Sequence, residues 1–328
     1  MESTNLRPIR ACIFDMDGLL LDTEDIATHC HNLVLEKYGK PKLPGAIKAA
    51  MMGCSGTDAT QVLQNWAQLP ISNAEYRQEV LVHQKDLFPT AGPLPGVEDL
   101  LRDLARAKQR EPAAAADDEE DMEGGSHRIH IALATSSSST TFKLKTDHLG
   151  DLFDVFEPDR RVLGDDPRIP RGRGKPMPDI FELALRTIND TREPGERLVI
   201  PEECLVFEDS VNGVEAARRA GMRVIWCPQA VLRDAYAGME AQVLAGRADP
   251  SRGEGLYLVS REGDGWGEQV ESLVDFPYAK YGIVVPAEED IEGEDAVTKS
   301  LVSMTESEGP LFMAERVLAM TEAHFQIM

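Results

Sequence analysis

The stretch ACIFDMDGLLLDTE, residues 11–24, decides how the rest of this chain is interpreted. It completes an apolar run, residues 9–14, which gives way at once to an acidic turn, residues 15–18. A short apolar run bounded by turn-forming residues is typical of a buried β-strand. The residues after the turn follow a helical pattern, so the stretch predicts a strand followed by helices.

The remaining sequence alternates between strand-like and helical segments. Three further apolar runs predict strands, at residues 129–134, 204–207 and 222–227. Apolar side chains recur at helical spacing in residues 97–108, 179–188 and 214–220. Strands that alternate with helices are joined by right-handed crossovers and form a mostly parallel sheet. We therefore predict an α/β fold with a doubly wound, mostly parallel, Rossmann-like sheet.

One segment, residues 22–92, breaks this alternation because its pattern is helical throughout. Its first helix, residues 24–38, carries apolar side chains on one face, and Pro93 marks the return to the sheet. We predict a small helical cap domain that is inserted after the first strand and covers the open end of the sheet. The predicted units are the cap at 22–92, the α/β core at 8–21 and 93–283, and a C-terminal tail at 284–328.

The charge of the chain is strongly negative and unevenly distributed. Its 328 residues include 34 Lys and Arg against 57 Asp and Glu, which gives a net charge of −23. Much of the excess lies in an acidic insertion at 109–128 and in the acidic start of the tail at 288–295. Both have few apolar side chains and are predicted to be disordered. Apolar residues between 311 and 325 could line a short helix within the tail.

Composition argues against several classes of protein. A strongly acidic chain is unsuited to binding nucleic acid through phosphate attraction, and no apolar stretch approaches the ~20 residues of a membrane span. Residues 1–10 lack the apolar core of a signal peptide. The five cysteines are scattered, which favours reduced thiols over disulfides or a zinc site. We expect a cytoplasmic monomer without nucleic-acid or membrane partners.

Polar side chains follow the predicted strands or begin a helix at the place where such sheets bind ligands, beyond the carboxyl ends of the strands. In chain order they are Asp15, Asp17 and Gly18, then Thr135 and Ser136, then Lys175, and finally Glu208 and Asp209. Each alone has an ordinary explanation: a surface turn, a serine-rich loop, a loop lysine, or a helix N-cap by Asp209. Together they favour a site where hydroxyl and lysine groups hold phosphate oxygens. Clustered carboxylates repel one another unless a cation lies between them, and their hard oxygen ligands favour Mg²⁺.

These segments resemble the four motifs of the haloacid dehalogenase superfamily of phosphohydrolases. FDMDG (14–18) resembles the first motif, LATSSSS (133–139) the second, GKPMPDIF (174–181) the third and VFEDSVNGVEAARRAGM (206–222) the fourth. The resemblance covers residues 9–283. Three further stretches are similar to the subgroup that holds pseudouridine-5′-phosphatase and the glycerol-3-phosphatases: MMG (51–53), FPTAGPLPG (88–96) and LGDDP (163–167).

The resemblance implies a Mg²⁺-dependent phosphomonoesterase that works on a small phosphorylated metabolite through an aspartyl-phosphate. Asp15 is then the nucleophile and Asp17 the acid and base, a role that needs a pKa closer to the working pH than that of a free Asp. The implied phosphate-binding residues, of which Thr135 and Lys175 also count as catalytic, are Gly18, Thr135, Ser136 and Lys175. The implied metal ligands are Asp15, the Asp17 carbonyl, Glu208 and Asp209.

The predicted cap is expected to select the substrate and exclude water. Its candidate contact loop consists of Met52, Gly53, Cys54 and Ser55. A nucleotide such as pseudouridine 5′-phosphate is favoured, with glycerol 3-phosphate or a sugar phosphate as the alternative. A phosphomutase shares all four motifs, and a non-catalytic scaffold that uses the acidic loop and tail for partners is the competing class.

Overall fold

The computed structural model describes residues 6–109, 127–248 and 260–287. In these ranges the centre of the fold is a six-stranded parallel sheet in the order β4-β3-β1-β5-β6-β7. Its strands are β1 Ala11–Phe14, β3 His130–Ala134, β4 Arg161–Val162, β5 Cys204–Glu208, β6 Arg223–Trp226 and β7 Gly267–Gln269. The predicted α/β fold is confirmed. The edge strands β4 and β7 were not predicted, because two or three residues are too few to show a periodicity.

The register of the central strands determines which residues meet at one edge. Strand β1 lies between β3 and β5, and Phe14 is level with both Leu133 and Phe207. The rings of Phe14 and Phe207 stack with their centroids 4.5 Å apart, which fixes this register on one face of the sheet. The residues that follow, Asp15 after β1 and Glu208 at the end of β5, therefore reach the same edge.

Helices cover the sheet and bury its apolar side chains. They are α5 Val97–Arg106, α6 Ser139–Thr146, α7 Asp179–Asp190, α8 Val211–Arg219, α9 Ala230–Ala235 and α10 Glu240–Leu244. On one face, Ile13, Val206 and Val224 of the sheet form a single apolar cluster with Phe181 of α7 and Val214 of α8. Alternate side chains of a strand point to opposite faces, so the burial of whole strands shows that both faces are covered.

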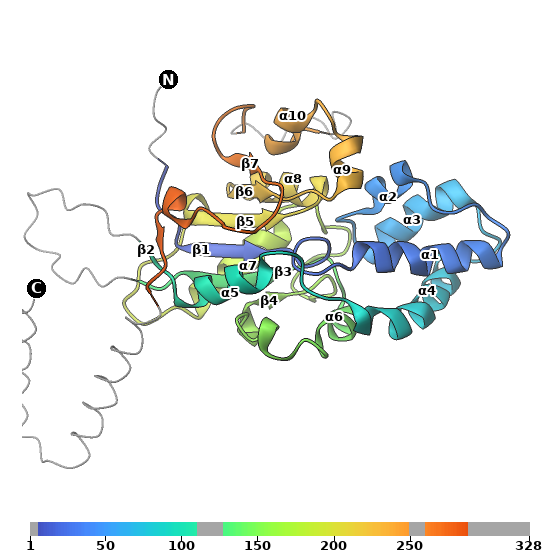
Figure 1. Cartoon of the computed structure of the whole chain (residues 1–328), viewed down its shortest axis with the longest axis horizontal. Helices are drawn as coiled ribbons and strands as arrows, with labels where there is room; N and C mark the ends of the chain where they lie inside the picture. Colours follow the sequence, from blue (N-terminus) through green and yellow to red (C-terminus); the bar gives the residue numbers. More distant parts are fainter. Residues whose placement is uncertain (1–5, 110–126, 249–259, 288–328) are drawn as a thin grey trace, which may run out of the picture. The chain divides into compact units, whose positions relative to one another are not determined.

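The segment between β1 and α5 consists of helices. They are α1 Glu24–Lys37, α2 Gly45–Met51, α3 Gly56–Ala67, α4 Asn73–Leu87 and the 3₁₀ turn η1 Phe88–Thr90. We call residues 22–92 the helical insertion. It has an apolar cluster of its own, centred on Cys30, Leu63 and Tyr76. Figure 1 shows its four helices together beyond the carboxyl end of β1.

The remaining described elements are short. A two-stranded antiparallel ladder joins β2 Lys108–Gln109 to β8 Ile283–Val284. The other 3₁₀ turns are η2 Gly150–Phe153, η3 Pro158–Arg160, η4 Pro201–Glu203 and η6 Tyr278–Tyr281. The predictions for the acidic insertion and for the tail fall almost wholly on residues outside the described ranges. All five cysteines are free, and no helix of the described residues is long and apolar enough to cross a membrane.

Candidate active site

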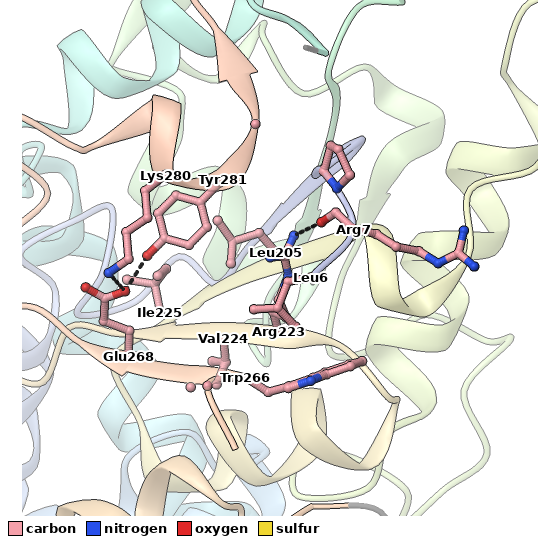
Figure 2. Close-up of a pocket in the computed structure, with 14 residues that line it drawn as sticks. Leu6, Arg7, Leu205, Arg223, Val224, Ile225, Trp266, Glu268, Lys280 and Tyr281 are labelled. Atoms are coloured by element: carbon pink, nitrogen blue, oxygen red, sulfur yellow. Dashed lines mark hydrogen bonds and ion pairs between the residues drawn. The ribbon is translucent and has the colours of Figure 1, made fainter. Parts of the chain in front are cut away.

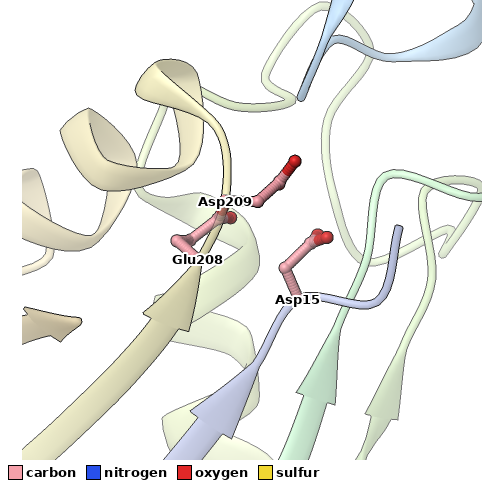
Figure 3. Close-up of side chains that lie close together, drawn as sticks. All are labelled: Asp15, Glu208 and Asp209. Atoms are coloured by element: carbon pink, nitrogen blue, oxygen red, sulfur yellow. The ribbon is translucent and has the colours of Figure 1, made fainter. Parts of the chain in front are cut away.

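Three buried carboxylates converge at the carboxyl ends of β1 and β5. Asp15, Glu208 and Asp209 are each at most 6% exposed, and one oxygen from each lies within 4.8 Å of the others. Figure 3 shows Asp15 after the end of β1, facing Glu208 at the end of β5 and Asp209 just beyond it. The register of β1 and β5 thus brings Asp15 next to two carboxylates that lie far from it in the sequence.

We call Asp15, Glu208 and Asp209 the acidic cluster. Lys175 lies directly against it. Its Nζ donates to Asp15 Oδ1 and, at 2.9 Å, to the carbonyl of Ala134, and lies 2.6 Å from Glu208 Oε1. The lysine is only 3% exposed. Three carboxylates face one ammonium group here, so two negative charges remain uncompensated, which is the charge of one divalent cation.

The electrostatics of the acidic cluster are those of a cation site. Burial, opposed by Lys175 and reinforced by Glu208 and Asp17, raises the pKa of Asp15 to about 7. Burial and the neighbouring Glu208 and Asp15 also raise the pKa of Asp209 well above its ordinary range. Among the described residues, Asp209 Oδ2 is buried without a hydrogen-bond partner. An orphaned, buried carboxylate oxygen beside two further carboxylates fits a hard cation such as Mg²⁺.

Two glycines make room for these carboxylates. Gly18 has φ +76°, and a Cβ there would lie 2.3 Å from Asp209 Oδ2. A Cβ on Gly213, in the first turn of α8, would lie 1.8 Å from Glu208 Oε1. Gly18 and Gly213 are therefore required because a carboxylate approaches each of them closely. The positive φ of Gly18 is a second reason for glycine at that position.

The turn after β5 directs Asp209 away from the helix that follows. Ser210 is the N-cap of α8, since its Oγ accepts from Gly213 N at 3.0 Å, and it also donates to Glu208 Oε2 at 3.0 Å. The alternative explanation that Asp209 caps this helix is therefore wrong. The indole of Trp226 donates to the Asp209 carbonyl at 2.7 Å, which anchors its backbone.

Asp17 lies beside the acidic cluster and has polar partners of its own. Its Oδ1 accepts from Thr23 at 2.6 Å and from Lys145 Nζ at 2.5 Å, and its Oδ2 accepts from Ser137 at 2.7 Å. Burial raises the pKa of Asp17, but Lys145 and these hydrogen bonds outweigh burial and hold the pKa below its ordinary value. The expectation of a pKa nearer the working pH was therefore wrong for this arrangement, because Lys145 was not foreseen.

Two of the predicted phosphate-binding residues, Thr135 and Ser136, follow β3 directly. Thr135 is fully buried, and its Oγ1 accepts from Ser137 N at 3.1 Å. Ser136 donates to the carbonyl of Gly53 at 3.2 Å, which links this loop to the helical insertion. Both follow β3 at the edge where Lys175 binds the Ala134 carbonyl.

The predicted contact loop of the helical insertion meets the same edge. The Met52 carbonyl accepts from Asn212 Nδ2 at 3.1 Å, and Gly53 packs so closely on Ser210 that a Cβ would lie 2.2 Å from its Oγ. Ser55, by contrast, is the N-cap of α3, and Cys54 Sγ donates to the Ala50 carbonyl. The loop backbone thus reaches residues that follow β3 and β5, whereas Ser55 has a local structural role.

Sequence reasoning did not find the residues that hold Asp17. Thr23 lies in the stretch at 11–24 and Ser137 in the second motif, but neither was singled out. Lys145 lies two turns into α6. The usable signal was the helical spacing from Ser137 to Lys145, which brings a lysine back over the strand end. Asn212, which binds the helical insertion, was likewise not singled out.

The model of the haloacid dehalogenase-like hydrolase family matches residues 9–221. The chain belongs to this family. The match covers the strands that carry Asp15, Thr135 and Glu208, together with Lys175. It confirms the predicted family.

Relatives and solved structures agree with this assignment. A protein of Saccharomyces cerevisiae named as a probable pseudouridine-5′-phosphatase is 36% identical over 275 residues, covering 84% of this chain and 98% of that protein. An Arabidopsis thaliana (DL)-glycerol-3-phosphatase is 35% identical and covers 72% of this chain and 70% of its own. The crystal structure of CbbY from Rhodobacter sphaeroides in complex with phosphate has the same fold, with a TM-score of 0.55 at 20% identity, covering 82% of this chain and 96% of that one. The prediction of a phosphatase is thereby confirmed.

Proposed function

We propose that the protein is a Mg²⁺-dependent phosphomonoesterase that hydrolyses a small phosphorylated metabolite through an aspartyl-phosphate. The observation that carries this proposal is the position of Asp15, a buried carboxylate that is hydrogen-bonded to Lys175 and shares the acidic cluster with Glu208 and Asp209. Hydrolysis of phosphate monoesters is extremely slow in water, so an enzyme must stabilise charge on the phosphoryl oxygens. Lys175 beside Asp15, together with a cation held by the acidic cluster, would supply that stabilisation.

In the proposed mechanism, Asp15 attacks phosphorus and releases the alcohol, and water then cleaves the aspartyl-phosphate. This divides one difficult displacement into two easier ones. Lys175 orients Asp15 and offers its charge to the phosphoryl oxygens, with Thr135 and Ser136 beside it. Mg²⁺, held by Asp15, Glu208, Asp209 and the Asp17 carbonyl, would neutralise charge on the carboxylates and the phosphoryl group.

Asp17 is proposed as the group that moves protons. It would protonate the leaving oxygen and then take a proton from the attacking water. In the arrangement described, three hydrogen bonds hold it as a carboxylate, which suits the second step. For the first step Asp17 must carry a proton, so the contact with Lys145 has to weaken while substrate is bound.

The helical insertion, residues 22–92, is proposed as a cap domain over a core formed by 8–21 and 93–283. Two hydrogen bonds support this: Ser136 to the Gly53 carbonyl, and Asn212 to the Met52 carbonyl. Both join the loop at 52–55 to the strand ends that carry the proposed catalytic residues. Substrate selection is assigned to this loop.

The favoured substrate is a nucleotide monophosphate such as pseudouridine 5′-phosphate. The match to the relative named for that activity covers 98% of that relative. The match to the glycerol-3-phosphatase is the basis for the alternative substrate, glycerol 3-phosphate. The free cysteines support the proposed cytoplasmic location, because unpaired thiols persist in reducing compartments.

The test is phosphate release from purified protein with Mg²⁺ or with EDTA. The panel is pseudouridine 5′-phosphate, uridine 5′-phosphate, glycerol 3-phosphate and glucose phosphates, with product analysis for isomerised sugar. Asp15→Asn should abolish turnover while the fold persists, whereas Asp86→Asn, which makes the same change at an exposed position on α4, should not. Turnover by Asp15→Asn would refute the nucleophile. Wild-type protein that releases no phosphate from any member would favour the scaffold, and isomerised product would favour a phosphomutase.

A further inference from the structure

A pocket of about 300 Å³ lies beside the amino-terminal parts of β5, β6 and β7 (Figure 2). It is separate from the acidic cluster. The strand register places Arg223 level with Leu205 at the pocket, and Trp226 level with Glu208 at the cluster. Three residues of strand correspond to ~10 Å, so the two sites lie toward opposite ends of the same strands.

The notable feature of this pocket is a buried cation. Arg223 lines it and is only 4% exposed. One of its nitrogens, Nη2, donates to the Arg7 carbonyl at 2.7 Å, as Figure 2 shows, whereas its Nε has no hydrogen-bond partner among the described residues. Among the residues that the structure describes, no carboxylate forms an ion pair with Arg223. Burial lowers the pKa of the Arg223 guanidinium. A buried guanidinium without an acid is costly, so an unassigned partner is expected.

The other charges of the pocket do not supply that partner. Glu268 is the acid that lines it, and its Oε2 accepts from Lys280 Nζ at 2.5 Å and from the Tyr281 hydroxyl at 2.6 Å. Its charge is therefore matched by Lys280. The pocket retains an excess positive charge at Arg223.

We propose that this pocket binds a small organic anion, with its oxyanion head at Arg223 and an apolar body against Leu205, Ile225 and the Tyr281 ring. A guanidinium binds carboxylate and phosphoryl oxygens equally well in geometric terms, so the shared chemistry is the planar or tetrahedral oxyanion. A volume of 300 Å³ is at the small end of ligand pockets, which suits a body about the size of one ring. This site is independent of the proposed phosphatase activity.

Binding is tested on the full chain with three probes of similar shape. Benzoate carries a carboxylate, phenylphosphonate a phosphoryl oxyanion, and benzamide no charge. Calorimetry gives the affinities. We expect benzoate or phenylphosphonate to bind at least about tenfold more tightly than benzamide, since a charge-assisted hydrogen bond discriminates by that amount. The tighter of the two anions identifies the head group.

Two variants decide whether Arg223 carries this binding. Arg223→Met should weaken the anion by about tenfold or more and leave the free protein at least as stable to urea, because a buried unpaired charge is removed. Glu268→Gln should tighten the anion, because it removes the competing acid and frees Lys280 and Tyr281. Phosphate release by both variants should equal that of the wild type. Absence of anion binding, equal binding of benzamide, or binding that survives Arg223→Met or weakens in Glu268→Gln would overturn the proposal.

Discussion

Removal of the divalent cation should make the folded protein less stable as the pH rises. The group responsible is Asp15, whose pKa burial raises from 3.8 to about 7, with Lys175 opposing the rise. Between these two values the folded state keeps a proton that the unfolded chain has lost. Stability contributed by the protonated form is therefore full below about pH 4 and is lost as the pH rises through 7.

The size of this loss follows from the same two values. A rise of about 3 pH units, at about 1.4 kcal/mol each, corresponds to a loss on the order of 4 kcal/mol between pH 4 and 8. Asp209 adds to the loss in the same direction, because its pKa is also raised by burial and by its acidic neighbours. Such a loss is a large share of the 5–15 kcal/mol that typically stabilises a domain.

Mg²⁺ should offset this loss and do so more strongly at high pH. A ligand that binds only the folded state stabilises it by about 2.7 kcal/mol at 100 times its Kd. Protons compete for the same carboxylates, so the gain should be small near pH 5 and large near pH 8. His31, whose pKa is lowered to about 4 by burial, acts in the opposite direction below pH 6.5. Its contribution cancels when Mg²⁺ and EDTA are compared at each pH.

The assay is urea denaturation, followed by circular dichroism, at several pH values with EDTA or excess Mg²⁺. Asp209→Asn removes one buried charge, so in EDTA at pH 8 it should be more stable than the wild type and gain less from Mg²⁺. Asp86→Asn, at an exposed position, should behave as the wild type. A wild-type gain from Mg²⁺ that is equal at pH 5 and pH 8, or an undiminished gain in Asp209→Asn, would refute the reasoning.

Three further substitutions probe the site. Lys145→Met should raise the pKa of Asp17 by about 1–2 units, since a charge-assisted hydrogen bond contributes about 1.5–3 kcal/mol. The limb of the pH–rate profile for phosphate release that reports Asp17 should move to higher pH by the same amount. A profile that does not move would show that Lys145 does not set this pKa. Gly213→Ala should cost about 1–3 kcal/mol in urea denaturation, because its Cβ would meet Glu208 Oε1 at 1.8 Å, whereas Gly56→Ala, with nothing within 4 Å, should not. Ser210→Ala should lose about 1–2 kcal/mol as a helix cap and also weaken the Mg²⁺ response through Glu208, whereas the cap variant Ser72→Ala should lose stability alone.

The parts of the structure that could be predicted are those that repeat a physical pattern along the chain. Apolar runs ending in acids or hydroxyls gave β1, β3 and β5, and the rule that ligands bind beyond the carboxyl ends of parallel strands brought Asp15 and Glu208 together. The position of β7 could not be derived, because Gly267–Gln269 pairs with β6 through its backbone and has no apolar alternation. The pocket at Arg223 depends on that pairing and was equally invisible.

The pKa values of the two motif aspartates illustrate what sequence cannot provide. Asp15 and Asp17 are two residues apart in one turn, yet burial beside acids raises the pKa of the first and Lys145 lowers that of the second. The difference arises from a side chain on α6, 128 residues away from Asp17 in the sequence. The turn thus presents two carboxylates of different character. Asp15 lies among acids and becomes a free nucleophile only when a cation balances them, whereas Asp17 is balanced by Lys145 already. Binding of the cation and the substrate would therefore act on the first aspartate through charge, and on the second by competing for its lysine.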